Sequence, residues 1–200
     1  MNIVVADLEG VFLPEIWINV AEKTGIEELK LTTRDISDYD VLMQKRLSIL
    51  DEHNLKIQDI QEVIATLEPL EGAKEMLDWI REKTQIVILS DTFEEFAKPL
   101  MKKLGYPALL CHNLTIDETG RITQYNLRIN NQKKEAVDAF KAMNYNVIGF
   151  GDSYNDIGMI QSANKGFFFR PPESVTTDFP DVPIVREYSE LKTMLESLLN

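Results

Sequence analysis

The sequence predicts an α/β fold: a Rossmann-like parallel sheet with an inserted helical cap domain. Two observations carry this prediction. Short apolar segments recur along the chain and alternate with segments of helical periodicity, which is typical of a parallel sheet whose strands are buried on both faces. One long stretch after the first apolar segment holds helical patterns only. We therefore expect a core domain over residues 1–14 and 69–200, and a cap domain over residues 15–68.

Each expected strand ends at a polar residue or a turn. The four strands are expected over residues 3–6, 85–89, 146–150 and 166–169. Helices are expected over residues 72–83, 93–104, 134–143 and 187–199, and Gly105 is a plausible C-cap for the second of them. Asp117 to Gly120 has the composition of a turn between extended segments, so residues 114–127 are predicted to form a hairpin.

The composition is that of an ordinary globular protein with a strong acidic excess. The 200 residues are 44% hydrophobic and 27% charged, with a formal net charge of −12. Such a chain would be repelled by nucleic acids and anionic membranes, so neither is expected as a partner. Cys111 is the only cysteine, which excludes an intrachain disulfide. No apolar run approaches the roughly 20 residues that span a bilayer, and no signal peptide is evident, so a cytoplasmic location is expected.

Polar side chains follow three of the expected strands at the point where each apolar run ends. They are Asp7, Ser90 and Asp152. Because ligand sites in open α/β sheets lie at the carboxyl ends of the strands, we expect these three side chains to converge. An aspartate after a strand is, on its own, usually a turn former or a helix cap. Three such positions in one chain favour a functional site.

The residue types at these positions suit phosphoryl transfer. A carboxylate such as Asp7 can attack phosphorus and form an aspartyl-phosphate, which divides one difficult transfer into two steps. Mg²⁺ prefers oxygen ligands and usually takes only a few protein carboxylates, which Asp7 and Asp152 could supply. A lysine and the Ser90 hydroxyl would hold the phosphoryl group. Glu9, two residues after Asp7, could protonate the leaving alkoxide.

Four short motifs resemble, in this order, the motifs of the haloacid dehalogenase (HAD) superfamily. Asp7-Leu8-Glu9-Gly10-Val11 is similar to the first motif, DxDx[TV], and Ser90 after an apolar strand resembles the second. Lys133 resembles the third motif, and the segment from Gly151 to Asp156 resembles the fourth, GDxxxD. Adjacent side chains on a helix point about 100° apart, so only one of Lys133 and Lys134 can face a site. The resemblance favours Lys133.

The resemblance implies a HAD-like core and a role for each motif residue. Asp7 would be the nucleophile and a metal ligand, and Asp152 a second ligand of Mg²⁺. Glu9 would be the general acid and base, with its backbone carbonyl directed at the metal. Asp156 would support the metal-bound waters or the phosphate-binding lysine. The substrate-binding residues expected in the core are Ser90, Asp91, Thr92, Lys133 and Asn155.

The cap resembles that of the phosphoserine phosphatases, which is also inserted directly after the first motif. Glu15 and Arg46, with Tyr39 preceding Arg46, resemble the residues that hold the ammonium and carboxylate groups of the substrate. The stretches DLEGV, PEIW, TTRDI, ILSDTF and GDSYND are similar to those of phosphoserine phosphatases that also transfer phosphate to homoserine. The implied activity is Mg²⁺-dependent transfer from phosphoserine to water or homoserine through phospho-Asp7.

Two positions depart from the pattern of the family. Glu9 stands where the superfamily usually has Asp, and its longer side chain is expected to activate water poorly, which would favour an alcohol acceptor. Asp91 and Thr92 stand where phosphoserine phosphatases commonly have two glycines, which bears on the fit of the substrate. The alternatives are a phosphatase for another small metabolite, a catalytically silent regulatory module on the same fold, or a response-regulator-like phosphoacceptor. A homodimer is possible.

Overall fold

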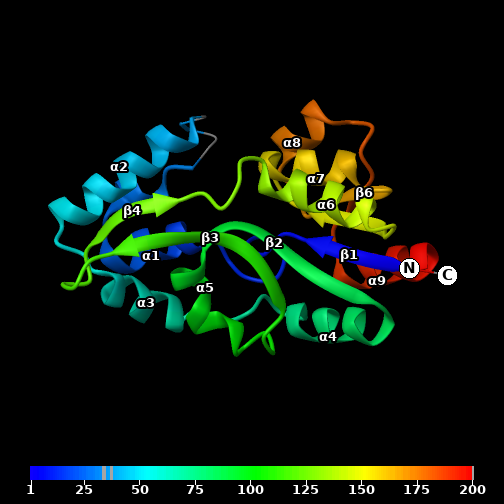
Figure 1. Ribbon diagram of the computed structural model, residues 1–200, viewed down its shortest axis with the longest axis horizontal. Helices are drawn as coiled ribbons and strands as arrows, with labels where there is room; N and C mark the ends of the chain where they lie inside the picture. Colours follow the sequence, from blue (N-terminus) through cyan, green and yellow to red (C-terminus); the bar gives the residue numbers. More distant parts are fainter. Residues whose placement is uncertain (33–34, 37, 200) are drawn as a thin grey trace.

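The computed structural model describes residues 1–32, 35–36 and 38–199, and a seven-stranded sheet forms its centre (Figure 1). The strand order is β4-β3-β2-β1-β5-β6-β7. The strands are β1 (Asn2–Ala6), β2 (Gln85–Phe93), β3 (Ala108–Ile116), β4 (Ile122–Asn126), β5 (Asn146–Gly151), β6 (Lys165–Phe169) and β7 (Ile184–Val185). All pairings are parallel except the antiparallel pairing of β3 with β4. The predicted α/β fold is confirmed.

Helices cover both faces of this sheet (Figure 1). One face carries α4 (Ala73–Lys83), α5 (Glu94–Met101) and α9 (Tyr188–Leu199). The other face carries α6 (Gln132–Ala142) and α7 (Ile157–Ser162), with α8 (Glu173–Asp178) farther out. A short 3-10 turn, Tyr154–Asp156, leads into α7.

The central strand β1 shows why this arrangement follows from the sequence. Side chains alternate between the two faces of a strand. Val4 and Ala6 therefore join the core cluster that includes α4, α5 and α9, whereas Ile3 and Val5 join the cluster that includes α6 and α7. Because both faces are covered, an unbroken apolar run is stable in this strand.

Three of the helices described between β1 and β2 lie within residues 15–68, where helical patterns were predicted. They are α1 (Ile16–Thr24), α2 (Tyr39–Glu52) and α3 (Ile57–Ala65), with a 3-10 turn at Glu27–Lys30. Residues 33 and 34, in the segment 32–36 that contributed to the family resemblance, lie outside the described residues.

The β3–β4 hairpin joins the core sheet to these helices. β3 pairs with β2 through its first half and with β4 through its second half. In Figure 1 the hairpin lies beside α2. Arg121 Nε, near the tip, donates to Asp51 Oδ1 of α2 at 2.6 Å, and the Ile57 N–H of α3 donates to the Gly120 carbonyl at 2.8 Å. These contacts attach the helices of residues 15–68 to the hairpin of the core sheet.

The ends of several elements differ from the predictions, and β3 begins at Ala108, ahead of the predicted hairpin. β2 continues to Phe93 instead of ending at residue 89, because an irregularity between Leu89 and Phe93 lets the strand resume pairing opposite His112. As a result α5 begins at Glu94, and it ends at Met101, short of the predicted residue 104. α6 begins at residue 132 rather than 134, which places Lys133 in its first turn. α7, α8 and β7 were not predicted; all three are short, and β7 has only two residues.

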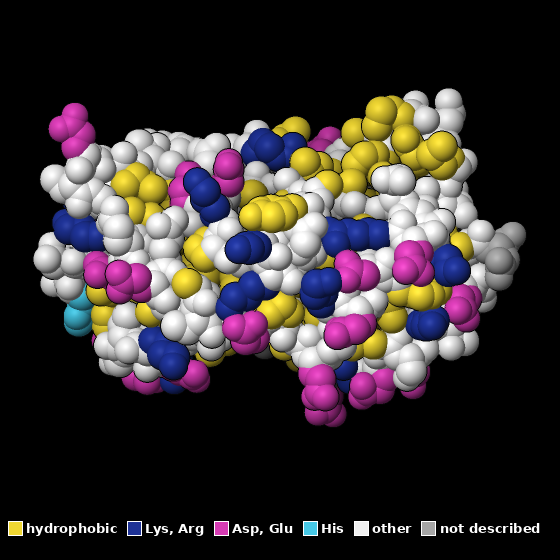
Figure 2. All heavy atoms as spheres, turned by 90° about the horizontal axis from the view of Figure 1, so that it is seen from below, with side chains coloured by type: hydrophobic (Ala, Val, Ile, Leu, Met, Phe, Trp, Pro, Cys, Tyr) yellow, Lys and Arg dark blue, Asp and Glu magenta, His cyan; other side chains and the backbone are white. Residues whose placement is uncertain are grey.

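The surface shows both signs of charge. Figure 2, the underside of the view in Figure 1, shows Lys and Arg side chains interspersed with acidic and apolar ones. Among the described helices, none is long and apolar enough to cross a membrane.

Candidate active site

The site lies at the carboxyl end of β1, the strand from which the order of the strands runs outward to both sides. β2, β3 and β4 lie on one side of β1, and β5, β6 and β7 on the other. Asp7 follows β1, Ser90 comes from β2 and Asp152 follows β5, and all three are buried. A switch in strand order of this kind is where open α/β sheets bind ligands. The predicted convergence of the three strand ends is therefore present.

Lys133 makes two short ion pairs inside the site. Its Nζ lies 2.9 Å from Asp7 Oδ1 and 2.7 Å from Asp156 Oδ1, and its side chain is only 3% exposed. Burial alone would lower the pKa of Lys133, but the charges of Asp156 and Asp7 outweigh it and hold that pKa well above its usual value. Lys134 instead pairs with Asp138 at the surface. The geometry thus brings Lys133, and not Lys134, to Asp7.

Asp156 connects the lysine to the loop after β5. Besides accepting from Lys133, it accepts through Oδ2 from the backbone N–H groups of Asp152 and Ser153, both at 3.0 Å. A Cβ at Gly151 would overlap the Asp156 carboxylate, so only glycine allows this close approach. Asp156 is therefore placed to fix Lys133 and Asp152 together.

Three carboxylates form a compact acidic cluster. Oxygens of Asp7, Asp152 and Asp156 lie within 4.8 Å of one another. Burial, together with the charge of Asp156, raises the pKa of Asp7 well above its usual value and the pKa of Asp152 to about 7. One ammonium group, from Lys133, faces these three carboxylates, so a divalent cation with oxygen ligands would balance the excess negative charge. Asp7 and Asp152 are the freer ligands, because both oxygens of Asp156 already accept hydrogen bonds.

The turn after Asp7 passes directly against Asp152. Gly10 in this turn has a φ of 75°, a conformation that glycine adopts without strain. A Cβ at Gly10 would lie 2.6 Å from Asp152 Cγ. The close approach of the first and fourth motifs therefore depends on this glycine.

Glu9 reaches from the same turn toward the first residue of α1. Its Oε2 accepts the N–H of Ile16, the first residue of α1, at 2.8 Å. Burial and the charge of Glu15 raise the pKa of Glu9 to about 7, so the group can give or take a proton near neutral pH. Its side chain does not belong to the acidic cluster found in the described residues. The metal contact expected for Glu9 would use its backbone carbonyl.

The irregular segment of β2 places Ser90, Asp91 and Thr92 on one rim of the site. Ser90 is 2% exposed, and its Oγ accepts the N–H of Thr92 at 3.3 Å. Asp91 accepts from Asn155 Nδ2 at 2.8 Å and from Gln132 Nε2 at 3.0 Å. Asp91 therefore joins β2 to the loop after β5 and to α6.

Gln132 and His112 are the residues that sequence reasoning missed. Both are buried polar side chains directed at Asp91. His112 lies in no metal-ligand spacing that would mark it in the sequence. Gln132 precedes the lysine of the third motif, and its position there was the one available signal.

Arg46 and Glu15 enter the site from α2 and α1. Arg46 is 7% exposed, its guanidinium lies 4.5 Å above the Trp17 ring, and Nη2 donates to the Leu31 carbonyl at 2.8 Å. Its Nε has no hydrogen-bond partner among the described residues. Burial lowers the pKa of Arg46 to about 10, against the opposing charges of Tyr39, Glu9 and Glu15. Glu15 is exposed and stands just before α1.

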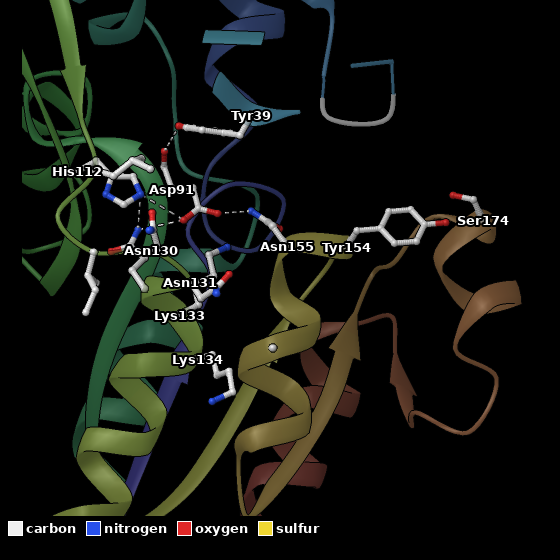
Figure 3. Close-up of a pocket in the computed structure, with 14 residues that line it drawn as sticks. Tyr39, Asp91, His112, Asn130, Asn131, Lys133, Lys134, Tyr154, Asn155 and Ser174 are labelled. Atoms are coloured by element: carbon white, nitrogen blue, oxygen red, sulfur yellow. Dashed lines mark hydrogen bonds and ion pairs between the residues drawn. The ribbon is translucent and has the colours of Figure 1, made fainter. Parts of the chain in front are cut away.

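These residues line a cavity of about 150 Å³ between the ends of the strands and the helices of residues 15–68. One wall includes Asp7, Glu9, Ser90 and Asp152, and the wall from residues 15–68 includes Glu15, Trp17, Tyr39 and Arg46. Pockets for drug-sized ligands measure about 300–1,000 Å³, so this cavity suits a small molecule. A larger hollow of about 1270 Å³ lies beside it (Figure 3).

Comparison with known proteins supports the family resemblance. The chain matches the haloacid dehalogenase-like hydrolases over residues 2–164. It is 59% identical over 192 residues to the phosphoserine phosphatase ThrH of Pseudomonas aeruginosa, covering 96% of this chain and 94% of that protein. It is 57% identical over 192 residues to a phosphoserine phosphatase of Pseudomonas syringae pv. tomato, covering 96% and 81%.

Solved structures agree with this assignment at the level of the fold. A phosphoserine phosphatase in its apo form superimposes with a TM-score of 0.77 over 98% of both chains, at 20% identity. A phospho-aspartyl intermediate analogue of phosphoserine phosphatase gives a TM-score of 0.75 over 98% of both chains, at 21% identity. The chain therefore belongs to the haloacid dehalogenase-like hydrolase family, in the group that includes the phosphoserine phosphatase ThrH.

Proposed function

We propose that this protein is a Mg²⁺-dependent phosphoserine phosphatase that works through a phospho-Asp7 intermediate. One observation carries the proposal: Asp7, which pairs with Lys133 at 2.9 Å, lines a small cavity whose opposite wall holds Arg46 and Glu15. A nucleophile and a phosphate-binding cation thus face groups that could bind an amino acid. The two Pseudomonas relatives named phosphoserine phosphatases support the same reading.

In the first step, an oxygen of Asp7 attacks phosphorus, and the bond between phosphorus and the serine oxygen breaks. Lys133 and the Ser90 hydroxyl neutralise and orient the phosphoryl oxygens. Glu9 gives its proton to the departing serine oxygen; its pKa of about 7 allows it to be protonated at that moment. Mg²⁺, held by Asp7, Asp152 and the Glu9 carbonyl, would supply positive charge that reduces the repulsion between carboxylate and phosphate.

In the second step, a water oxygen attacks the phosphorus of phospho-Asp7, and the bond between phosphorus and the Asp7 oxygen breaks. Glu9, now ionised, takes the proton of the water. Phosphate leaves and the Asp7 carboxylate is restored. Because Glu9 is hydrogen-bonded to the first residue of α1, Ile16, the position of this base depends on the position of the cap.

The cap wall supports a zwitterionic substrate. The Arg46 guanidinium would pair with the substrate carboxylate, for which its Nε is a further donor, and the Glu15 carboxylate would pair with the ammonium. The cavity volume favours a phospho-amino acid over a nucleotide or another large metabolite. A silent regulatory module would have no need for a nucleophile, an acid and a phosphate cation in one cavity.

Substrate selectivity tests the proposal. The protein with Mg²⁺ is assayed against phosphoserine, phosphoethanolamine, which lacks the carboxylate, and glycerol phosphate, which lacks both charged groups. The expected order of kcat/KM is phosphoserine, phosphoethanolamine, glycerol phosphate. Equal values would contradict the amino-acid assignment and leave the phosphatase assignment standing. No phosphate release from any of them would overturn both.

The metal can be tested without an activity assay. Mg²⁺ that binds only the folded protein should raise its thermal stability, by about 2.7 kcal/mol at a concentration one hundred times its Kd. An Asp152→Asn variant should lose this Mg²⁺-dependent increase, whereas Asp138→Asn, a surface carboxylate on α6, should keep it. An increase of the same size in Asp152→Asn would contradict this metal site.

A second candidate activity is transfer of the phosphoryl group to homoserine. Two features of Glu9 favour it. Its side chain is longer than that of the usual Asp, and its carboxylate already accepts the Ile16 N–H, which leaves it less available to activate a water. Phosphate and phosphohomoserine would be measured together for the wild type and for Glu9→Asp. A lower proportion of phosphohomoserine in Glu9→Asp is expected. The same proportion in both would mean that Glu9 does not select the acceptor.

Three further expectations stay predictions. We propose residues 15–68 as the cap domain and residues 1–14 and 69–200 as the core, supported by the position of α1, α2 and α3 between β1 and β2. The cytoplasmic location and the homodimer rest on the sequence alone. Light scattering coupled to size-exclusion chromatography would test the homodimer.

A further inference from the structure

The small cavity and the larger hollow beside it share a wall. Four residues line both: Tyr39, Asp91, Tyr154 and Asn155. Within this wall, Asp91 Oδ2 accepts from Asn155 Nδ2 at 2.8 Å. Figure 3 shows the Asp91 carboxylate lying between His112 and Asn155. This hydrogen bond joins β2 to the loop after β5 within the wall that separates the two cavities.

Buried groups hold Asp91 from behind. Gln132 Nε2 donates to Asp91 Oδ1 at 3.0 Å and also to the Ser90 carbonyl. His112 Nδ1 accepts the backbone N–H of Arg128 at 3.0 Å, so its proton is assigned to Nε2, which lies 3.6 Å from Asp91 Oδ1. Gln132 and His112 are 2% and 4% exposed. The carboxylate is therefore oriented by the core rather than by solvent.

The cap contributes a third part of the wall. Tyr39, the first residue of α2, donates its hydroxyl to the Asp91 carbonyl at 3.2 Å. Its ring packs edge-on against Tyr125 of the hairpin, with centroids 5.9 Å apart. Asp91 is thus tied to the core, to the cap and to the loop that carries Asn155.

We propose that the Asp91–Asn155 bridge is a partition that keeps water of the larger hollow away from phosphorylated Asp7. Asp91 is then a positioning residue that influences how the phosphoryl group divides between water and an alcohol. The inference rests on the proposed function. Its basis is placement: Asp91 adjoins Ser90, which would hold the phosphoryl group, and the hollow beyond has room for many water molecules.

The bridge requires a group that accepts on both sides. Asp91 receives hydrogen bonds from Gln132 on one side and Asn155 on the other. An asparagine would turn its amide nitrogen toward one of these donors and lose that bond. An alanine would lose both. Asp91→Ala should therefore remove both hydrogen bonds of the bridge. Asn155→Ala should remove only the bond from Asn155, and because Asn155 is exposed, folding should be less affected.

Exchange of labelled serine measures the division directly. Serine leaves when phospho-Asp7 forms, so serine can also attack phospho-Asp7 and regenerate phosphoserine. The protein, Mg²⁺, unlabelled phosphoserine and a saturating concentration of labelled serine are incubated together. The ratio of labelled phosphoserine formed to phosphate released is recorded. This ratio does not depend on how much of the protein is folded, so a merely structural defect leaves it unchanged.

The ratio should fall several-fold in Asp91→Ala and in Asn155→Ala, because water gains access to phospho-Asp7. Asp138→Asn, a charge removal at the surface of α6, should keep the wild-type ratio. If Asp91→Ala does not fold, Asn155→Ala decides the question.

Three outcomes would overturn the partition. The ratio could be unchanged or higher in the folded variants, or both variants could fold normally and yet form neither product, which would place the two residues in the chemistry itself. If the wild type forms neither product, the proposed function fails and the partition falls with it. If the wild type forms both, the partition is tested on its own.

Discussion

The two ends of the small cavity are built differently. At the end proposed to hold the phosphoryl group, Asp7 and Asp152 line the cavity, and Lys133 and Asp156 lie behind them; all four are buried and are joined by ion pairs and hydrogen bonds of 2.7 to 3.0 Å. At the end proposed to bind the amino acid, the charged groups come from residues 15–68, which we propose as the cap. Glu15 is exposed, and Arg46 makes one short hydrogen bond to a backbone carbonyl and stacks on an aromatic ring.

This difference assigns the reaction at phosphorus to one end of the cavity and the recognition of the substrate to the other. Bond making at phosphorus requires atoms fixed in position, because small displacements of reacting groups are costly. A network of buried charges supplies that fixity. Selection of a substrate requires groups that meet the ligand on entry, and helices resting on a hairpin can supply them without disturbing the nucleophile. Changes at the core end should therefore alter kcat and stability, and changes at the cap end should alter KM.

The largest effect is expected at the nucleophile. Asp7→Asn replaces the attacking oxygen with an amide that cannot form the acyl-phosphate, so kcat for phosphoserine should fall by at least about 10³-fold. Steady-state assays would be accompanied by circular dichroism to verify the fold. Asp138→Asn makes the same chemical change at the surface and should retain wild-type activity. Appreciable turnover by Asp7→Asn would mean that another group attacks phosphorus. The core end of the cavity would then not be the place of bond making.

Two neighbouring lysines give a test of the buried network. Lys133→Met leaves the carboxylates of Asp7 and Asp156 without their cation, and removing one partner of a buried ion pair costs about 3 kcal/mol of folding stability. Lys134→Met, one residue away, breaks only a surface pair with Asp138 and should unfold like the wild type. Urea denaturation monitored by tryptophan fluorescence would measure both. Equal stability of the two variants would contradict the structural role of the buried pair.

Much of the core end could be predicted from the sequence, because its residues follow the strands directly. The apolar runs before Asp7 and Asp152 locate two strand ends, and the topology of a parallel sheet brings such ends together. The family resemblance favoured Lys133 and left Asp156 open between that lysine and metal-bound waters; the structure pairs Asp156 with Lys133. The exact start of α6 decides which of two adjacent lysines faces inward, and the ends of helices are the least predictable part of a sequence.

The wall around Asp91 could not be predicted in the same way. Its partners, Gln132 and His112, come from α6 and β3, and neither has a spacing that signals function. They are brought to Asp91 by the irregularity in β2 after Leu89, which extends the strand beyond its predicted end. Tertiary pairing between strands decides such features, and local periodicity does not record them.

The cap end is tested most directly at Arg46. Hydrogen bonds to charged groups contribute about 1.5–3 kcal/mol, so Arg46→Ala should raise KM for phosphoserine by roughly 10-fold to 100-fold. The kcat should change much less, because the phosphate end is intact. Glycerol phosphate, which has no carboxylate, should show little change in KM. Lys45→Ala, the exposed neighbour on α2, serves as the control. A loss confined to kcat would place Arg46 in the chemistry and break the division between the two ends.

The smallest effect is expected where the two ends touch. Tyr39→Phe removes the hydroxyl that α2 donates to the Asp91 carbonyl, and a neutral hydrogen bond contributes about 0.5–1.5 kcal/mol. KM for phosphoserine should therefore rise by only a few-fold, with kcat nearly unchanged. Tyr125→Phe is the control. The Tyr125 ring packs against Tyr39, but its hydroxyl donates to Asp40 of α2, so its removal should leave KM unchanged. If Tyr39→Phe lowers kcat as strongly as Asp7→Asn does, the cap would have to position the nucleophile as well, and the two ends would act as one unit.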